Sequence, residues 1–360
     1  MPTDTAVEDD AGLPPDPLHA LIAALFVQAG ISPASAEIVA HALVAADVGG
    51  KASHGVMLVP MYLERLRAGS VSCADHARVV HDGKTALVLD ADNMLGQLSA
   101  NQASQLAVSR AREYGLAMVT VRNAFHFGEA GYWARRMAAT GCVGIVMANT
   151  RPLMPAPGGA ERRVGNNPLA IAMPHADDVP VVLDMAMSAS AMGKIRLAER
   201  AGQPIPDGWA TDAQGAPTRD PAAAIAGMLL PAAGAKGFGL AFMVDLLCGG
   251  LSDGAIGDEV RPLYGDVTKP YGSAQAFLAI DPAHFGLERS FAQRASELAR
   301  TVRESRPAPG VARVFSPGEQ SWQFAQSHCE RCPVSVDTAK HLTALARSAG
   351  IAPPDAWRTL

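Results

Sequence analysis

Three short segments of the 360-residue sequence combine a reactive side chain with a glycine or with the end of an apolar run. They are Ser53-His54-Gly55, His126-Phe127-Gly128, and Asp184 at the end of VPVVLD. An unperturbed histidine has a pKa of about 6.5, so it can donate and accept protons near neutral pH. Either histidine could act as a general acid, although a histidine that only caps or braces the fold would have the same local sequence.

Glycine-rich segments form a second group, at residues 155–159, 164–168 and 234–239. Glycine lets backbone N–H groups face an anion, and Lys236 adds a positive charge suited to phosphate. Ordinary turns would also explain these glycines. No G-x-G-x-x-G step follows an early strand, where the common dinucleotide fold binds pyrophosphate. A bound nucleotide would therefore need a different arrangement.

The elements that position these segments follow from the apolar periodicity. Residues 17–47 predict two helices, and His54 falls just before another helix that has Pro60 in its first turn and Gly69 as its cap. From about residue 81 to 190, strands alternate with helices, which predicts an α/β sheet with covering helices. A loop at 202–221 then precedes a strongly apolar segment, expected to be a buried helix, after GAKGFG.

Composition excludes several classes of function. No uncharged apolar run reaches the roughly 18–20 residues of a membrane span, and a net charge of -5 gives no motive for binding nucleic acid or an anionic membrane. Residues 1–15 contain acids and prolines instead of an export signal, so we expect a disordered tail there. The sequence predicts a soluble cytoplasmic protein that acts on a small molecule.

The five cysteines do not form a disulfide framework in a chain of this length without an export signal. Cys329 and Cys332 have CxxC spacing, which could be half of a zinc site together with His328 or His341. No second pair exists, so we favour two incidental thiols and expect no metal.

In this order, the segments resemble the malate/L-lactate dehydrogenase family that lacks the Rossmann fingerprint, whose relatives include ureidoglycolate, sulfolactate and diketogulonate enzymes and piperideine-2-carboxylate or pyrroline-2-carboxylate reductases. The resemblance covers about residues 17–350, including SHGV, HFGEAGYWARRMA, GNNPLAIAMP, VVLDMAMSASAMGKI and GAKGFGLAFMVDLLCGGL. It implies a non-Rossmann α/β dinucleotide-binding fold with a central mixed sheet, NADH or NADPH as cofactor, and a homodimer. It also implies a helical subdomain from residues 16–80 and 320–360, and a body at 81–319, of which about 120–255 binds the dinucleotide.

By this resemblance His54 is the proton donor, with Ser53 in a supporting hydrogen bond. The residues implied to contact the dinucleotide are His126, Phe127, Gly128, Glu129, Ala130, Asp184, Met185, Ala186, Ala235, Lys236 and Arg313. The sequence does not decide between NAD and NADP, although Arg306 and Arg313 slightly favour a 2′-phosphate.

Two departures concern the substrate. Leu58 stands where the family usually has an arginine that holds the substrate carboxylate, and Asn166 replaces the threonine of a G-T-N-P step. Lys194, where imine reductases have an aspartate, favours the hydroxyacid branch. Leu58 leaves three readings open: a larger apolar substrate, lost activity, or a different arginine holding the carboxylate. The candidates for that arginine are Arg65, Arg151, Arg162 and Arg163.

The sequence therefore predicts an NAD(P)-dependent oxidoreductase that transfers hydride to C2 of a 2-oxo acid or cyclic 2-imino acid, or catalyses the reverse from a 2-hydroxy acid. The alternative is a non-catalytic descendant that only binds a dinucleotide.

Overall fold

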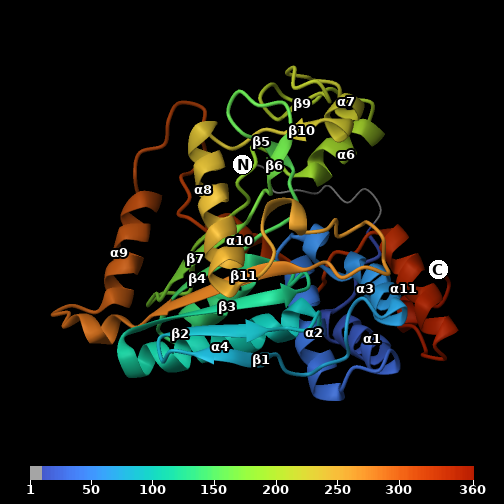
Figure 1. The fold of residues 1–360 in the computed structure, drawn as a ribbon, viewed down its shortest axis with the longest axis horizontal. Coiled ribbons are helices and arrows are strands. Elements are labelled where there is room, and N and C mark those ends of the chain that lie inside the picture. The colour runs from blue at the N-terminus through green and yellow to red at the C-terminus, as the bar shows by residue number, and fades with distance from the viewer. Residues whose placement is uncertain (1–9) are drawn as a thin grey trace.

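A seven-stranded sheet runs through the computed structural model, which describes residues 10–360 (Figure 1). Its strands, in spatial order, are β1 (Arg78–Asp82), β2 (Ala86–Asp90), β3 (Leu116–Ala124), β11 (Ser273–Ile280), β4 (Val143–Ala148), β7 (Leu169–Met173) and β8 (Val181–Met185). Only β2 and β3 pair in parallel, and the other neighbours are antiparallel. The predicted central mixed sheet is confirmed.

Strand β11 lies in the middle of the sheet, and its alternating side chains serve two different cores. Phe277 and Ala279 belong to the main core, under the helices α4 (Gly96–Tyr114) and α5 (Ala130–Ala138). Ala274 and Ala276 belong to a second hydrophobic cluster on the other face, next to the end of helix α8 (Ala235–Asp245). Helix α5 approaches β4 closely because Gly144 has no side chain there: a Cβ would lie 2.7 Å from the Ala134 carbonyl oxygen.

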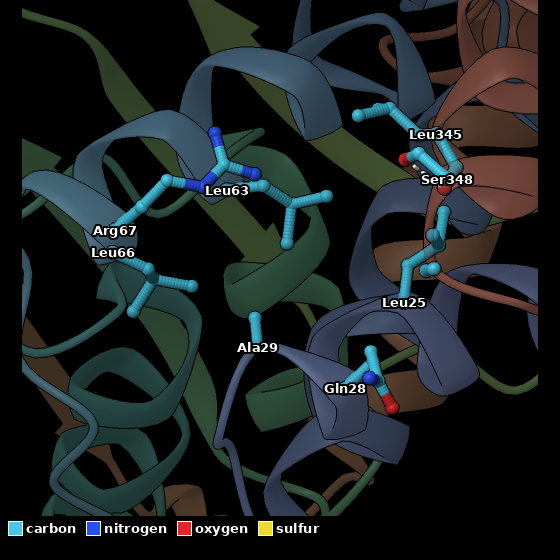
Figure 2. A pocket seen from close by; sticks show the side chains of 9 residues that line it. Leu25, Gln28, Ala29, Leu63, Leu66, Arg67, Leu345 and Ser348 are labelled. Atoms are coloured by element: carbon cyan, nitrogen blue, oxygen red, sulfur yellow. Dashed lines mark hydrogen bonds between the residues drawn. The ribbon is translucent and has the colours of Figure 1, made fainter.

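Helices from both ends of the chain gather at one end of the sheet (Figure 1). They are α1 (Pro15–Gln28), α2 (Pro33–Val48), α3 (Val59–Ala68) and α11 (Val336–Ser348), with α10 (Glu319–Ser327) preceding the last of them. The predicted end of α3 is confirmed, since Gly69 adopts a left-handed φ of 76° there. Leu25, Leu63 and Leu345 line a groove of about 280 Å³ between α1, α3 and α11, and no predicted site residue lines it (Figure 2).

The predicted tail at residues 1–15 is only partly open to description, because residues 1–9 lie outside the described residues. Residues 10–14 differ from the expectation. Leu13 is buried, and it exchanges backbone hydrogen bonds with Cys332 at 3.2 and 2.8 Å. The apolar side chain and the satisfied backbone hold this stretch in place, and α1 begins directly after it at Pro15.

A small lobe with its own core stands above one edge of the sheet (Figure 1). It contains β5 (Met154–Pro155), β6 (Arg162–Val164), α6 (Met192–Arg200), β9 (Ala210–Thr211), α7 (Pro221–Ala226) and β10 (Met228–Leu229). Met154, Met187, Ile195 and Leu229 are fully buried in it. The loop predicted at 202–221 is mostly irregular and ends where Asp220 caps α7. The stretch 81–319 thus holds more than one core.

Helix α8 (Ala235–Asp245), which continues as a π-helical turn over Leu246–Gly250, corrects the expectation of a buried apolar helix. Ala241 and Val244 face the rest of the protein, but Leu240, Phe242 and Met243 are 48%, 47% and 56% exposed. The helix has apolar side chains on both its covered and its open side. Beyond it, α9 (Phe291–Arg303) stands at the β8 edge (Figure 1). Within residues 10–360, no helix has the length and apolar character needed to cross a membrane.

Candidate active site

The loop that carries His54 connects α2 to α3 through two 3₁₀ turns, Ala52–His54 and Val56–Leu58. The buried Asp47 carboxyl group accepts the Val56 N–H at 2.6 Å, and this hydrogen bond holds the loop in place. Burial raises the pKa of Asp47 to about 8, against the effect of the Val56 hydrogen bond. Gly55 is required at this point, since a Cβ there would lie 2.1 Å from the Asp47 carboxylate.

His54 is half-buried, and each of its ring nitrogens has a different environment. Nδ1 lies 2.9 Å from the exposed Ser53 hydroxyl, whereas Nε2 has no hydrogen-bond partner within residues 10–360. Burial lowers the pKa of His54; the nearby Glu129 charge opposes that shift and Lys51 adds to it. The imidazole is therefore biased toward its neutral form and keeps one nitrogen available.

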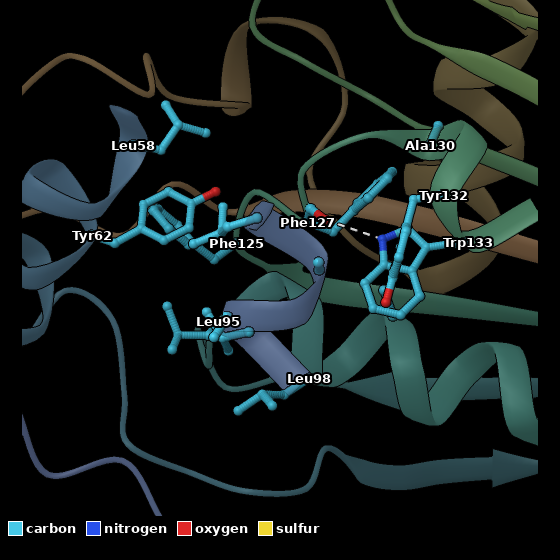
Figure 3. Packing of buried hydrophobic residues seen from close by; sticks show 14 of the residues in the cluster. Leu58, Tyr62, Leu95, Leu98, Phe125, Phe127, Ala130, Tyr132 and Trp133 are labelled. Atoms are coloured by element: carbon cyan, nitrogen blue, oxygen red, sulfur yellow. Dashed lines mark hydrogen bonds between the residues drawn. The ribbon is translucent and has the colours of Figure 1, made fainter. Parts of the chain in front are cut away.

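His126 lies against His54, with ring centroids 5.7 Å apart and ring planes 27° from parallel. Its Nδ1 is 2.6 Å from the hydroxyl of Tyr62, and the buried Gln97 amide donates to the same hydroxyl oxygen at 3.3 Å. Burial and the neighbouring His54 lower the pKa of His126 to about 3. Tyr62 packs edge-on against Phe125 at 5.0 Å, within the main core (Figure 3). The structure thus brings the two histidines together.

A buried group of charges lies behind the histidines. Glu129 accepts both guanidinium N–H groups of Arg135, at 3.0 and 3.1 Å. Burial alone would raise the pKa of Glu129, but this ion pair holds it below its usual value. Burial and the Glu129 charge raise the pKa of the neighbouring Asp184. A Cβ on Gly131 would lie 2.7 Å from Asp184 and 3.0 Å from Glu129, so the glycine lets the carboxyl groups come close.

Leu58 differs from the expectation that its side chain meets the substrate. It is 1% exposed and lies in the main core beside Tyr62 (Figure 3). The turn at Val56–Leu58 places this side chain in the core. Asn166, the other residue expected to contact substrate, is half-buried and accepts the Thr150 hydroxyl hydrogen at 3.0 Å.

The loop at residues 126–130 contributes mostly packing groups. Phe127 and Ala130 are each 4% exposed, and the Phe127 carbonyl accepts the Trp133 indole N–H at 3.0 Å (Figure 3). Gly128 has a φ of 82° and lies beside the His54 carbonyl. A ligand could therefore contact only the backbone of this loop and the His126 side chain. The sequence could not tell such backbone contacts from side-chain contacts.

Two other segments predicted to bind the dinucleotide differ in exposure, and the one at the start of α8 is open. Ala235 and Lys236 begin α8, and neither their backbone N–H groups nor the Lys236 ammonium has a partner within residues 10–360. These free donors and the positive charge fit a dinucleotide phosphate. Near the end of β8, Met185 and Ala186 are half-buried.

Arg313 belongs to a segment tied to the same edge of the sheet. The Val182 N–H donates to the Pro317 carbonyl at 3.1 Å, and this bond fastens residues 313–319 to β8. Arg313 forms an ion pair with the buried Glu319 and lies 5.1 Å from the centre of the Phe315 ring. About half of its side chain remains exposed. Its charge is therefore partly neutralised before any ligand arrives.

Neither thiol of the cysteine pair hydrogen-bonds to a candidate site residue within residues 10–360; Cys329 contacts the Gln326 carbonyl and Cys332 the Pro333 carbonyl. Cys329 is exposed, Cys332 is buried, and both are free thiols. In the part of the chain that the structure describes, no three His, Cys, Asp or Glu side chains gather as a possible metal site.

Sequence reasoning missed Tyr62, Gln97, Lys51 and Arg135. Tyr62 and Gln97 sit in helical segments whose pattern indicated only packing, so their polar ends gave no separate signal. Lys51 precedes the Ser-His-Gly step by two positions and could have been found by its charge alone.

Comparison with known proteins identifies the class. The chain is 37% identical over 326 residues to ureidoglycolate dehydrogenase (NAD(+)) of Escherichia coli O157:H7, covering 90% of this chain and 93% of the relative. It is 40% identical over 256 residues to (2R)-3-sulfolactate dehydrogenase (NADP(+)) of Chromohalobacter salexigens, covering 71% and 77%. Among solved structures, delta1-piperideine-2-carboxylate reductase from Pseudomonas syringae matches with a TM-score of 0.84 and 30% identity, covering 93% and 99%.

The mixed sheet without a Rossmann glycine loop and the relatives together define an NAD(P)-dependent oxidoreductase with a nicotinamide dinucleotide cofactor. The model of the malate/L-lactate dehydrogenase family matches residues 13–343, and the chain belongs to this family.

Proposed function

We propose that the protein transfers hydride between NAD(P)H and C2 of a 2-oxo acid or cyclic 2-imino acid, or catalyses the reverse reaction from a 2-hydroxy acid, with His54 as proton donor. The observation that carries this proposal is the His54 ring, held at Nδ1 by Ser53 at 2.9 Å while Nε2 remains free within the described residues. When bound, the dihydronicotinamide supplies the hydride to C2. The Nε2 proton of His54 goes to the substrate oxygen or nitrogen, and Nδ1–H stays bonded to Ser53.

The electrostatics of His54 bear on the direction of proton transfer. Because burial lowers its pKa, the free protein holds His54 mainly neutral near pH 7. A neutral imidazole is ready to accept the hydroxyl proton of a 2-hydroxy acid. In the reductive direction the same group must first take up a proton.

Position 58 carries no cation, so the substrate carboxylate needs one from elsewhere. Three of the four candidate arginines already bind other groups of the chain. Arg65 is fully buried and donates to the carbonyls of Lys269 at 2.9 Å and Leu263 at 2.8 Å. Arg162 donates to the Gly227 carbonyl at 2.9 Å. These guanidinium groups brace loops.

Arg163, the third engaged arginine, pairs with Glu161 and lies 3.5 Å from Asp258. Arg151 is different: it is half-buried, and its guanidinium has no partner in residues 10–360. Burial, with the nearby positive charge of Arg162, lowers its pKa, so an anion there would relieve an unfavourable charge.

Arg151 directly follows Thr150, whose hydroxyl bonds to Asn166. We assign the carboxylate contact to Arg151, with Asn166 alongside it. A bidentate Arg–carboxylate pair would then restore the contact that Leu58 does not make.

A homodimer is part of the proposal. Leu240, Phe242, Met243 and Leu251 are apolar and between 47% and 56% exposed, along α8 and the turn that follows. A contiguous apolar surface of this kind marks an interaction site, and a second copy of the chain would cover it. Sedimentation velocity on the wild type tests the dimer. All five cysteines are free thiols, which supports a reducing compartment such as the cytoplasm.

The deciding experiment is a substrate panel of 2-oxo acids, 2-hydroxy acids and cyclic imines, each followed with NAD(H) and NADP(H). We expect turnover with at least one carboxylate substrate. NADH or NADPH binding, seen by nicotinamide fluorescence, without turnover on the whole panel would contradict the enzyme proposal and favour a non-catalytic dinucleotide-binding descendant.

A further inference from the structure

Two hydrogen bonds flank His54 and tie its loop to helix α2. Before the histidine, the Lys51 N–H donates to a backbone carbonyl of α2 at 2.8 Å. After it, the Val56 N–H donates to the carboxyl group of Asp47 at 2.6 Å. In the part of the chain that the structure describes, this second bond is the only side-chain hydrogen bond between residues 49–58 and other segments. Replacing Asp47 therefore removes one tie and leaves the other intact.

The Asp47 carboxyl group acts on the loop by contact and not by charge. Asp47 is 3% exposed, and burial raises its pKa to about 8, so the group is mainly neutral near pH 7. The charges that shift the pKa of His54 are those of Glu129 and Lys51, and Asp47 is not among them. Any influence of Asp47 on His54 must therefore pass through the loop backbone.

Gly55, the residue directly after His54, lies against the same carboxyl group. A Cβ on Gly55 would be 2.1 Å from one oxygen of Asp47 and 2.3 Å from the other. The carboxyl group thus fills the space between Gly55 and α2. It sets how closely the loop approaches the helix at the position next to the histidine.

Building on the proposed function, in which His54 exchanges a proton with the substrate, we infer that Asp47 is a positioning residue for this transfer. Its carboxyl group holds Gly55 and Val56 at a fixed place against α2 and so sets the place of the His54 ring. Proton transfer needs heavy atoms about 2.6–3.2 Å apart, and a displacement of about 1 Å can lower the rate about 100-fold. The effect of Asp47 should therefore fall on kcat and not on cofactor affinity.

The first test compares Asp47→Ala with Asp47→Asn. The alanine variant should lower kcat about 10- to 100-fold while the affinity for NADH or NADPH stays within a few fold. The asparagine variant keeps a neutral side chain of the same size with an oxygen that accepts the Val56 N–H, so it should restore most of kcat. Each kcat is divided by the number of cofactor sites from fluorescence titration, which removes any loss of folded protein. Unchanged kcat in Asp47→Ala, or equal losses in both variants, would overturn the inference.

Gly55→Ala tests the same contact from the other side and does not depend on the folding of Asp47→Ala. The backbone at Gly55 is extended and open to alanine, so the added methyl group meets only the Asp47 carboxyl group. This variant should lower kcat. Removing the carboxyl group makes room for the methyl group, so the double variant Asp47→Ala/Gly55→Ala should be no slower than Asp47→Ala alone. Multiplied losses in the double variant would show that the two residues act independently and would contradict the inference.

A measurement without substrate is the hydrogen exchange of the Val56 amide in the full-length protein, followed by NMR. We expect slow exchange in the wild type and in Asp47→Asn, and exchange at least about tenfold faster in Asp47→Ala. Fast exchange in the wild type would show that the bond does not hold the loop.

Asp281→Ala is the matched control. The carboxyl group of Asp281 also accepts a single backbone N–H, that of Ala283 at 2.9 Å. Asp281 follows the end of β11 that pairs with the start of β3, whereas His126 follows the end of β3. This variant should leave both kcat and the Val56 exchange rate unchanged.

The outcomes separate the two proposals. If the wild type turns over no substrate, the proposed function fails, and the Val56 exchange rates alone decide whether Asp47 holds the loop. If the wild type is active and Asp47→Ala matches it, the proposed function stands and the role of Asp47 is wrong.

Discussion

The two sides of the candidate site differ in how far the chain satisfies its own polar groups. Around the histidines, Ser53, Tyr62 and Gln97 already hold the rings by hydrogen bonds, and a buried ion pair stands behind them. At the start of α8, the charges, the N–H groups and the apolar face all lie open. In the proposed function, the groups for proton transfer are thus prearranged within one chain. The proposed cofactor and dimer contacts at α8 instead use groups that have no partner among the described residues.

The largest expected effect is on the prearranged side, from His54→Ala. Turnover should fall about 10²- to 10⁴-fold, the usual contribution of a positioned acid or base, because the imidazole that exchanges the proton with the substrate is removed. Steady-state kinetics with titration of NADH and NADPH provides the measurement, and cofactor affinity should stay within a few fold. Unchanged turnover would assign the proton donor to His126 and would contradict the distinction drawn between the two sides of the site.

Arg151→Ala should raise the KM for the carboxylate substrate about 10- to 100-fold, since a charge-assisted contact of about 1.5–3 kcal/mol is lost. Arg163→Ala is the control, because its guanidinium already pairs with Glu161 and Asp258. If the two variants behave alike, Arg151 is not the carboxylate contact.

On the open side, Lys236→Ala should weaken NAD(P)H binding about fivefold, corresponding to about 1 kcal/mol for an exposed charge, and less at high salt. Lys340→Ala on α11 removes another exposed lysine away from this face and should change nothing. Fluorescence titration of both variants gives the comparison. A loss of the same size in Lys340→Ala would indicate a general charge effect.

The smallest expected effect is on the pH at which kcat/KM changes. Oxidation needs neutral His54, so its kcat/KM should fall as the pH drops through the pKa of His54, which burial places below 6.5. Reduction needs the protonated form and should decline as the pH rises through the same pKa. Profiles measured in both directions should share this inflection. An inflection above pH 6.5 would show that Glu129 outweighs burial.

The sequence was sufficient for the main elements and for singling out the two histidine segments, but it did not predict that the two rings lie together. The alternation of strands and helices predicted β2, α4, β3, α5 and β4 because each has a clear apolar period. A glycine lies one or two positions after each histidine, and the structure shows why: a Cβ on Gly55 would meet Asp47, and Gly128 has a φ of 82°.

The sequence could not show which way a side chain points or which group it contacts. Leu58 had the right spacing to meet a substrate, but the turn at Val56–Leu58 points it into the core. The apolar composition of α8 predicted burial, yet composition cannot tell whether the same chain covers both sides of a helix. Arg65 and Arg151 look alike in sequence, and only the carbonyl groups around Arg65 separate a brace from a free cation.

The placement of β11 also has a consequence for the order in which the protein matures. Strand β11 fills the centre of the sheet between β3 and β4, but it lies at residues 273–280 of 360. On the ribosome, β3 and β4 therefore remain without their central partner strand until more than a hundred further residues have been synthesised. Until then, two long apolar strands have unpaired backbone groups, so this is the stage at which the nascent chain is most dependent on chaperones and most open to aggregation.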